Sequence, residues 1–125
     1  MLKREPLVRG SVCTIYVLRM SHRERADALE YVLGLPKPQQ KKIVKELEHL
    51  SRYGPPANPE KWKQLRGTPG ICEIKVKPAR LMCFFDGPQA VVLTHGFSKK
   101  SDRTPPGQIE RAIRLQREYR EQSGD

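Results

Sequence analysis

The chain has 125 residues, the length of one domain with one modest hydrophobic core. Its 24 lysines and arginines outnumber its 14 aspartates and glutamates, which gives a formal net charge of +10. This excess argues against basic partners and favours acidic ones, among which nucleic acid comes first.

The apolar runs and the cysteines argue against a membrane protein and a zinc protein. No apolar run approaches the length of a membrane span or of a signal peptide. Cys13, Cys72 and Cys83 are odd in number, lack a CxxC spacing and lie in apolar, strand-like runs. They are typical of small buried residues in a reducing compartment rather than of a zinc site. We therefore expect a single cytoplasmic domain over residues 1–125, without metal or other cofactor and without a membrane partner.

The first sixty residues predict one strand and two helices. Residues 12–18 are β-branched and aromatic, which favours a strand. Ser21 to Glu24 has the form of a capping box and predicts a short helix that ends at Gly34. Its apolar side carries Ala26, Leu29, Val32 and Leu33. A second, amphipathic helix is predicted from Pro38 to about Tyr53, with an apolar face of Ile43, Val44, Leu47 and Leu50.

The second half of the chain predicts strands and a last helix. Residues 62–65 fit a short strand or an ordered loop, and the alternation over 71–77 predicts a strand with one wet, basic face. Residues 80–85 and 90–94 flank a turn signal and predict a hairpin. Thr104 is the expected N-cap of a helix whose core-facing stripe is Ile109, Ala112, Ile113 and Tyr119. The predicted fold is α+β, in the order β-α-α-β-β-β-α, with a small and mostly antiparallel sheet covered by helices.

The basic excess is concentrated in this strand-rich half. Residues 61–104 contain nine lysines and arginines against three acidic residues. His95 and the nearby Lys99 and Lys100 follow the apolar run 90–93, where a scaffold element would present titratable and cationic groups to an anion. Arg80 opens another strand, so the pattern indicates a small sheet with a surface that faces phosphate.

Five motifs in this half resemble, in register, the HigB branch of the RelE/ParE toxin superfamily of type II toxin-antitoxin systems. They stand here as Leu65-Arg66-Gly67, Cys72-Glu73-Ile74-Lys75, Ala79-Arg80-Leu81, His95-Gly96-Phe97-Ser98-Lys99-Lys100 and Thr104-Pro105. Cys72 and Cys83 occupy positions where the family often has tyrosine, and Lys75 a position where it often has arginine. The first sixty residues match mainly in the order of their elements.

The resemblance implies a RelE-like fold and a toxin that cleaves messenger RNA on the ribosome without a metal ion. In such a reaction the ribose 2′-OH attacks the adjacent phosphorus, so groups are needed to move protons and to stabilise negative charge. We expect His95, whose imidazole titrates near neutrality, to carry a proton, and Arg80 and Lys75 to contact the reacting phosphate. The further phosphate-binding residues expected are Arg66, Lys63, Lys77, Lys99 and Lys100. Expected partners are the ribosome, messenger RNA and a cognate antitoxin, which we expect to be a helix-turn-helix protein.

Structural roles compete with these assignments. His95 has an alternative as a core histidine that bonds to backbone, and Arg80 as the partner of Glu73 in a surface ion pair. Trp62 and Phe97 are better explained as core anchors than as base-stacking rings. Two further functions also stay open: a ParE-like inhibitor of DNA gyrase, which the missing tyrosines favour slightly, and a non-catalytic nucleic-acid-binding protein or degenerate toxin.

Overall fold

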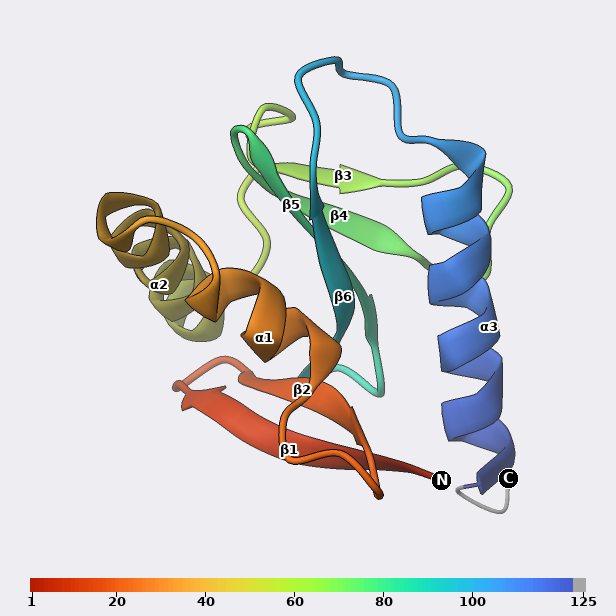
Figure 1. Ribbon diagram of the computed structural model, residues 1–125. Helices are drawn as coiled ribbons and strands as arrows, with labels where there is room; N and C mark the ends of the chain where they lie inside the picture. The colour runs from red at the N-terminus through yellow and green to blue at the C-terminus, as the bar shows by residue number, and fades with distance from the viewer. Residues whose placement is uncertain (123–125) are drawn as a thin grey trace.

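The computed structural model describes residues 1–122 as a six-stranded mixed sheet with helices against both faces (Figure 1). The strand order across the sheet is β1-β2-β6-β5-β4-β3, and only the β2–β6 pair is parallel among the strands of residues 1–122. The elements are β1 (Leu2–Arg9), β2 (Thr14–Met20), α1 (Asp27–Leu33), α2 (Lys37–Tyr53), β3 (Trp62–Gln64), β4 (Cys72–Val76), β5 (Ala79–Phe85), β6 (Ala90–Ser98) and α3 (Pro106–Gln122). The predicted α+β class and mostly antiparallel sheet are confirmed.

The edge strand β1 was not expected. Its sequence is charged and contains Pro6, features that weaken a strand signal but are common on exposed edges, where they prevent further pairing. The ladder with β2 shifts register between Pro6 and Val8, which accommodates the proline. At the start of β1 the backbone of Leu2 forms two hydrogen bonds with the Gln122 side chain, which connects β1 to the end of α3.

The first helix begins later than the capping-box pattern predicts. Helix α1 starts at Asp27, and its N-cap Ala26 makes no side-chain capping bond. The Arg19 guanidinium bonds to the carbonyl oxygens of Met20, Ser21 and Arg23, with the shortest contact, to Arg23, at 2.6 Å. These bonds hold the segment as a turn, so the Ser21 capping box was wrong.

Two hydrophobic cores lie on opposite faces of the sheet. Helices α1 and α2 cover one face and bury Ala28, Ile43, Leu47 and Leu50 against the inner strands. Helix α3 covers part of the other face, where Ala112 packs among Leu18, Leu65, Met82 and Phe84. Val44 and Leu33, both predicted to face the core, are instead exposed. The three cysteines are free and buried as predicted, and burial raises the pKa of the Cys72 thiol to about 11.

Strand β4 departs most from its prediction. An alternating strand with a wet, basic face was expected, but Cys72, Glu73, Ile74 and Lys75 are all buried. The reason is its position between β3 and β5, with a helix-covered core on one side and the 99–104 segment on the other. None of the helices in residues 1–122 is both long and apolar enough to cross a membrane.

Candidate functional site

The strand register brings several predicted residues onto the face of the sheet that α3 partly covers. Directly opposed residues of an antiparallel pair project to the same side. Lys63 of β3 opposes Glu73 of β4, and Lys75 of β4 opposes Arg80 of β5. Three strands thus place Lys63, Lys75 and Arg80 on the same face of the sheet as Glu73, beyond the end of the α3 core.

We call Glu73, Lys75, Arg80, Lys99 and Thr104 the Glu73 cluster. Arg80 Nε lies 3.0 Å and Lys99 Nζ 3.4 Å from Oε2 of Glu73. The Thr104 hydroxyl donates to Oε1 of Glu73, and Lys99 Nζ donates to the Thr104 hydroxyl at 3.1 Å. Lys75 Nζ donates to the Pro59 carbonyl at 3.0 Å. The cluster therefore connects β4 and β5 to the segment that leads into α3.

The Arg80–Glu73 pair anticipated on the surface is buried, since neither side chain has any exposed area. The pair also leaves some of its hydrogen-bonding groups unused. Arg80 Nη1 donates to the Ala79 carbonyl, but Nε is not aligned for a hydrogen bond, and Nη2 has no hydrogen-bond partner within residues 1–122. A buried guanidinium with an unused donor is costly, because its lost contact with water is not replaced.

The charges of the Glu73 cluster do not cancel. Glu73 supplies one negative charge, whereas Lys75, Arg80 and Lys99 supply three positive charges. At low dielectric such an excess attracts an anion strongly. Solvent reaches the cluster only at its margin: the side chain of Lys99 is 6 % exposed, whereas those of Arg80 and Glu73 are fully buried. Arg80 therefore has no direct contact with an outside phosphate unless the 99–104 segment moves.

The folded structure changes the pKa of Lys99. Burial lowers its pKa below the usual value for lysine, and the nearby Glu73 carboxylate opposes this effect. Its ammonium group consequently releases a proton more readily than an exposed lysine does. A cation with this property, next to a net positive charge, is suited to hold a phosphate and to donate a proton to a leaving oxygen.

The other predicted phosphate-binding residues lie at the rim. Lys63, Arg66 and Lys100 are exposed, and Lys77 stands at the β4–β5 turn, where it pairs with Glu60 at 2.6 Å and with Asp102 at 3.7 Å. Lys63 shares the face of the cluster through its register, whereas Arg66 lies in the turn after β3. The rim thus adds exposed positive charge around the buried group.

His95 lies within β6, which continues to Ser98, rather than after the end of a strand as predicted. Its ring is buried, with Nδ1 3.0 Å from the Thr94 hydroxyl and Nε2 2.9 Å from Oε1 of Gln108. Burial, assisted by the charge of Arg111, lowers the pKa of His95 to about 4, so the imidazole is neutral at pH 7.

The surroundings of His95 differ from those of the Glu73 cluster. Arg111 and Arg114 of α3 and Asp27 of α1 are the charged side chains that shift its pKa. Tyr31 fills the space beside Gly96, and its hydroxyl bonds to the Phe97 carbonyl and the Ser98 hydroxyl. The histidine is therefore part of a polar contact between β6, α1 and α3. It directly opposes Met82, which opposes Glu73, so the register places His95 on the same face of the sheet as the Glu73 cluster.

The contribution of Thr104 to the site was not predicted. It was expected to cap the last helix, but α3 begins at Pro106, and the Thr104 hydroxyl binds Glu73 instead. Glu73 entered the sequence argument within the Cys72-Glu73-Ile74-Lys75 motif and as a partner for Arg80, but not as a site residue. An isolated acid in a basic strand is the signal that could have identified it.

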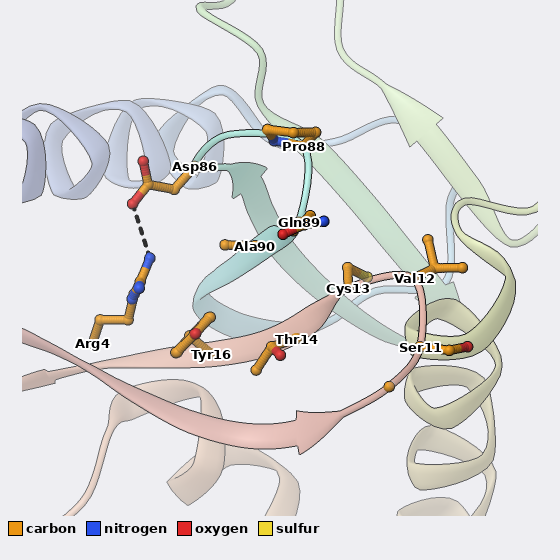
Figure 2. A pocket seen from close by; sticks show the side chains of 11 residues that line it. Arg4, Ser11, Val12, Cys13, Thr14, Tyr16, Asp86, Pro88, Gln89 and Ala90 are labelled. Carbon is orange, nitrogen blue, oxygen red and sulfur yellow. Dashed lines mark hydrogen bonds and ion pairs between the residues drawn. The ribbon is translucent and has the colours of Figure 1, made fainter.

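A different concave region lies between the β1–β2 hairpin and the β5–β6 turn (Figure 2). In Figure 2 its side chains include Ser11, Thr14 and Gln89, and Arg4 reaches across to Asp86. The Arg4 guanidinium also lies 4.0 Å from the centre of the Tyr16 ring. Its cation is thus already paired and stacked, so this region offers an anion less than the Glu73 cluster does.

The match to a family model includes all five residues of the Glu73 cluster. The model of phage-derived Gp49-like proteins (DUF891) matches residues 30–117, more than half of the chain. The chain belongs to the Gp49-like family. Gp49-like proteins are a RelE-like toxin family, which supports a toxin role and, in general terms, an antitoxin partner. No curated protein matches the chain. Within residues 1–122 no three His, Cys, Asp or Glu side chains are grouped to hold a metal ion.

Proposed function

We propose that this Gp49-like protein is the toxin of a type II toxin-antitoxin pair, in the HigB branch, and that it cleaves messenger RNA on the ribosome. The observation that carries the proposal is the Glu73 cluster, in which Arg80 and Lys99 lie against one carboxylate, Lys75 stands opposite Arg80, and exposed lysines lie nearby. Such a site fits a phosphodiester, whose negative charge increases as the reaction proceeds.

The reaction divides into defined steps. The ribose 2′-oxygen loses its proton and bonds to the neighbouring phosphorus, the bond from phosphorus to the 5′-oxygen breaks, and that oxygen takes up a proton. The products are a 2′,3′-cyclic phosphate and a 5′-hydroxyl. Lys75 and Lys99, at the margin of the cluster, contact the phosphate, while Arg80 strengthens the positive field beneath them. Lys99, whose pKa is lowered by burial, donates the proton to the leaving oxygen.

His95 is our candidate for accepting the 2′-OH proton. Its neutral ring has the correct protonation state for a base. Both ring nitrogens are already hydrogen-bonded, to Thr94 and Gln108, so one bond must open before the ring accepts a proton. In this proposal, binding to the ribosome triggers the change.

Induction of the chain in cells, followed by mapping of RNA 5′ ends, tests the proposal. We expect new 5′ ends that require phosphorylation before ligation, because a 5′-hydroxyl is not a substrate for ligation. Lys75→Met should reduce cleavage by about 10²-fold, the usual scale for losing a charge stabiliser. Arg80→Met should do the same at equal folded fraction, since it also leaves Glu73 without its buried partner. Lys63→Met, an exposed lysine on the same face, serves as the matched control and should have a much smaller effect.

The same experiment separates the alternatives. DNA breaks with intact RNA would instead indicate a gyrase inhibitor. A chain that is harmless without any partner and binds RNA without cutting it would indicate a non-catalytic protein. Co-expression with the neighbouring reading frame, if it encodes a small helix-turn-helix protein, should abolish the toxicity.

A further inference from the structure

We propose that a lysine-lined groove beside the Glu73 cluster holds the phosphate backbone of single-stranded RNA. This groove, the α2 groove, lies between α2, the loop that precedes β3, and the end of β4. Its lining comprises Lys42, Lys45 and Glu46 from α2, Asn58, Glu60 and Lys61 from the loop, and Lys75, Val76 and Lys77 from β4 and its turn. The first sixty residues had not been expected to contribute to RNA binding.

The groove carries a net positive charge because its lysines outnumber its acids. Lys61 pairs with Glu46 at 3.2 Å and Lys77 with Glu60 at 2.6 Å, so two of the five lysines are neutralised locally. Lys42 and Lys45 are exposed, and neither forms an ion pair with residues 1–122. They are the charges in the groove that are free to bind an outside anion.

The spacing of these two lysines suits an extended polyanion. Lys42 and Lys45 are i, i+3 neighbours on one helix, which places their Cβ atoms roughly 5–6 Å apart on one face. Both ammonium groups can therefore reach one stretch of backbone. The groove has a single aliphatic side chain without charge, the half-buried Val76, among its lining residues. An acidic protein segment is the competing occupant, and the measurement of antitoxin binding below distinguishes it from RNA.

Lys75 connects the α2 groove to the Glu73 cluster. It lines the groove, its Nζ is fixed by the Pro59 carbonyl, and it directly opposes Arg80 across the β4–β5 ladder. Val76 and α2 belong to the opposite face of the sheet from the cluster, so a strand of RNA in the groove would reach the cluster around the end of the β4–β5 hairpin, past Lys77. This orientation rests on the proposed function, whereas binding of RNA in the groove does not.

Binding and cleavage are measured separately to test the groove. The probe is a fluorescent single-stranded RNA of about a dozen nucleotides, within the usual site size for such proteins, with 2′-O-methyl groups that block attack by the 2′-oxygen. The test variant is Lys42→Glu with Lys45→Glu. The matched control is Lys37→Glu with Lys41→Glu, which changes the charge of α2 equally at exposed positions outside the groove. Melting curves verify that both variants are folded.

We expect the Lys42/Lys45 variant to bind the probe at least about tenfold more weakly than the wild type. The slope of log affinity against log salt concentration should become shallower by roughly 1.4, which corresponds to two lost phosphate contacts on a single strand. The control variant should retain most of the affinity and most of the salt dependence. If RNA binding weakens equally in the two variants, the effect comes from overall charge and the proposal is overturned. A wild-type chain that does not bind the probe would also overturn it. Loss of antitoxin binding with unchanged RNA binding would assign the groove to a protein partner instead.

The outcomes distinguish this inference from the proposed function. If the wild-type chain binds the probe through Lys42 and Lys45 but cleaves no RNA in cells, the groove stands and the nuclease assignment fails. If the Lys42/Lys45 variant binds and cleaves as the wild type does, the nuclease assignment stands and the groove is ruled out.

Discussion

The Arg80 guanidinium lies 3.0 Å from the Glu73 carboxylate, with both side chains completely buried between the sheet and the 99–104 segment. Breaking a buried pair leaves one charge without a partner, which costs more than the intact pair contributes. The same two residues therefore affect both the stability of the domain and the charge of its candidate site.

Glu73→Gln should destabilise the fold strongly. The substitution removes the negative charge that lies beside both Arg80 and Lys99, and we expect a loss of about 3–5 kcal/mol in the free energy of unfolding, measured by urea denaturation. The double variant Glu73→Leu with Arg80→Met should be less destabilised than Glu73→Gln, because it leaves no unpaired guanidinium. A double variant that is much less stable than the single variant would contradict this account of the pair.

Lys99 and its neighbour Lys100 should respond differently to the same substitution. Lys99→Met removes a buried cation that contacts Glu73 and Thr104, so we expect RNA cleavage to fall by about 10²-fold. Lys100 is exposed, and Lys100→Met should reduce cleavage by less than about tenfold, the effect of losing one screened charge. Translating ribosomes provide the assay. Equal effects at the two positions would remove the special role of Lys99.

His95 should make the stability of the domain depend on pH. Its pKa is lowered from 6.5 to about 4 in the folded chain, so the unfolded chain binds the proton more readily. The stability that the neutral ring contributes is therefore complete above pH 6.5 and is lost as the pH falls towards 4. The full loss is on the order of 3 kcal/mol. His95→Gln should flatten this part of the stability curve measured between pH 4 and pH 7.

The same histidine variant also tests catalysis. A folded His95→Gln protein that cleaves RNA at the full rate would show that His95 only positions β6 against α3. If His95 is the base, cleavage should fall by about 10²-fold while the protein stays folded at pH 7.

Gly96→Ala should destabilise the domain, because a Cβ at this position would overlap the Tyr31 ring. Moving the ring would also disturb its hydroxyl bonds to Phe97 and Ser98. We expect a loss of about 1–3 kcal/mol, measured by thermal or urea unfolding. Gly107→Ala is the matched control, since its Cβ would meet no atom within 4 Å and an alanine favours the helix. A comparable loss at both glycines would rule out the steric explanation.

The sequence by itself determined the class of fold, most of the elements and the location of the basic residues. Helix α2, the β5–β6 hairpin and the burial of the cysteines followed from periodicity, turn chemistry and hydrophobicity, which act locally. Strand β1 was not predicted, because a charged edge strand lacks the alternation of apolar and polar residues that indicates a strand.

Tertiary structure alone decided which basic residues act together. Alternation along β4 predicted a wet face for Glu73 and Lys75, and only the 99–104 segment, folding back from β6, buries that face and supplies Lys99 and Thr104. The same is true of His95, whose partners on α1 and α3 are distant in sequence. A local pattern specifies the residues that are able to carry charge, whereas burial and pairing depend on segments that meet only in the folded chain.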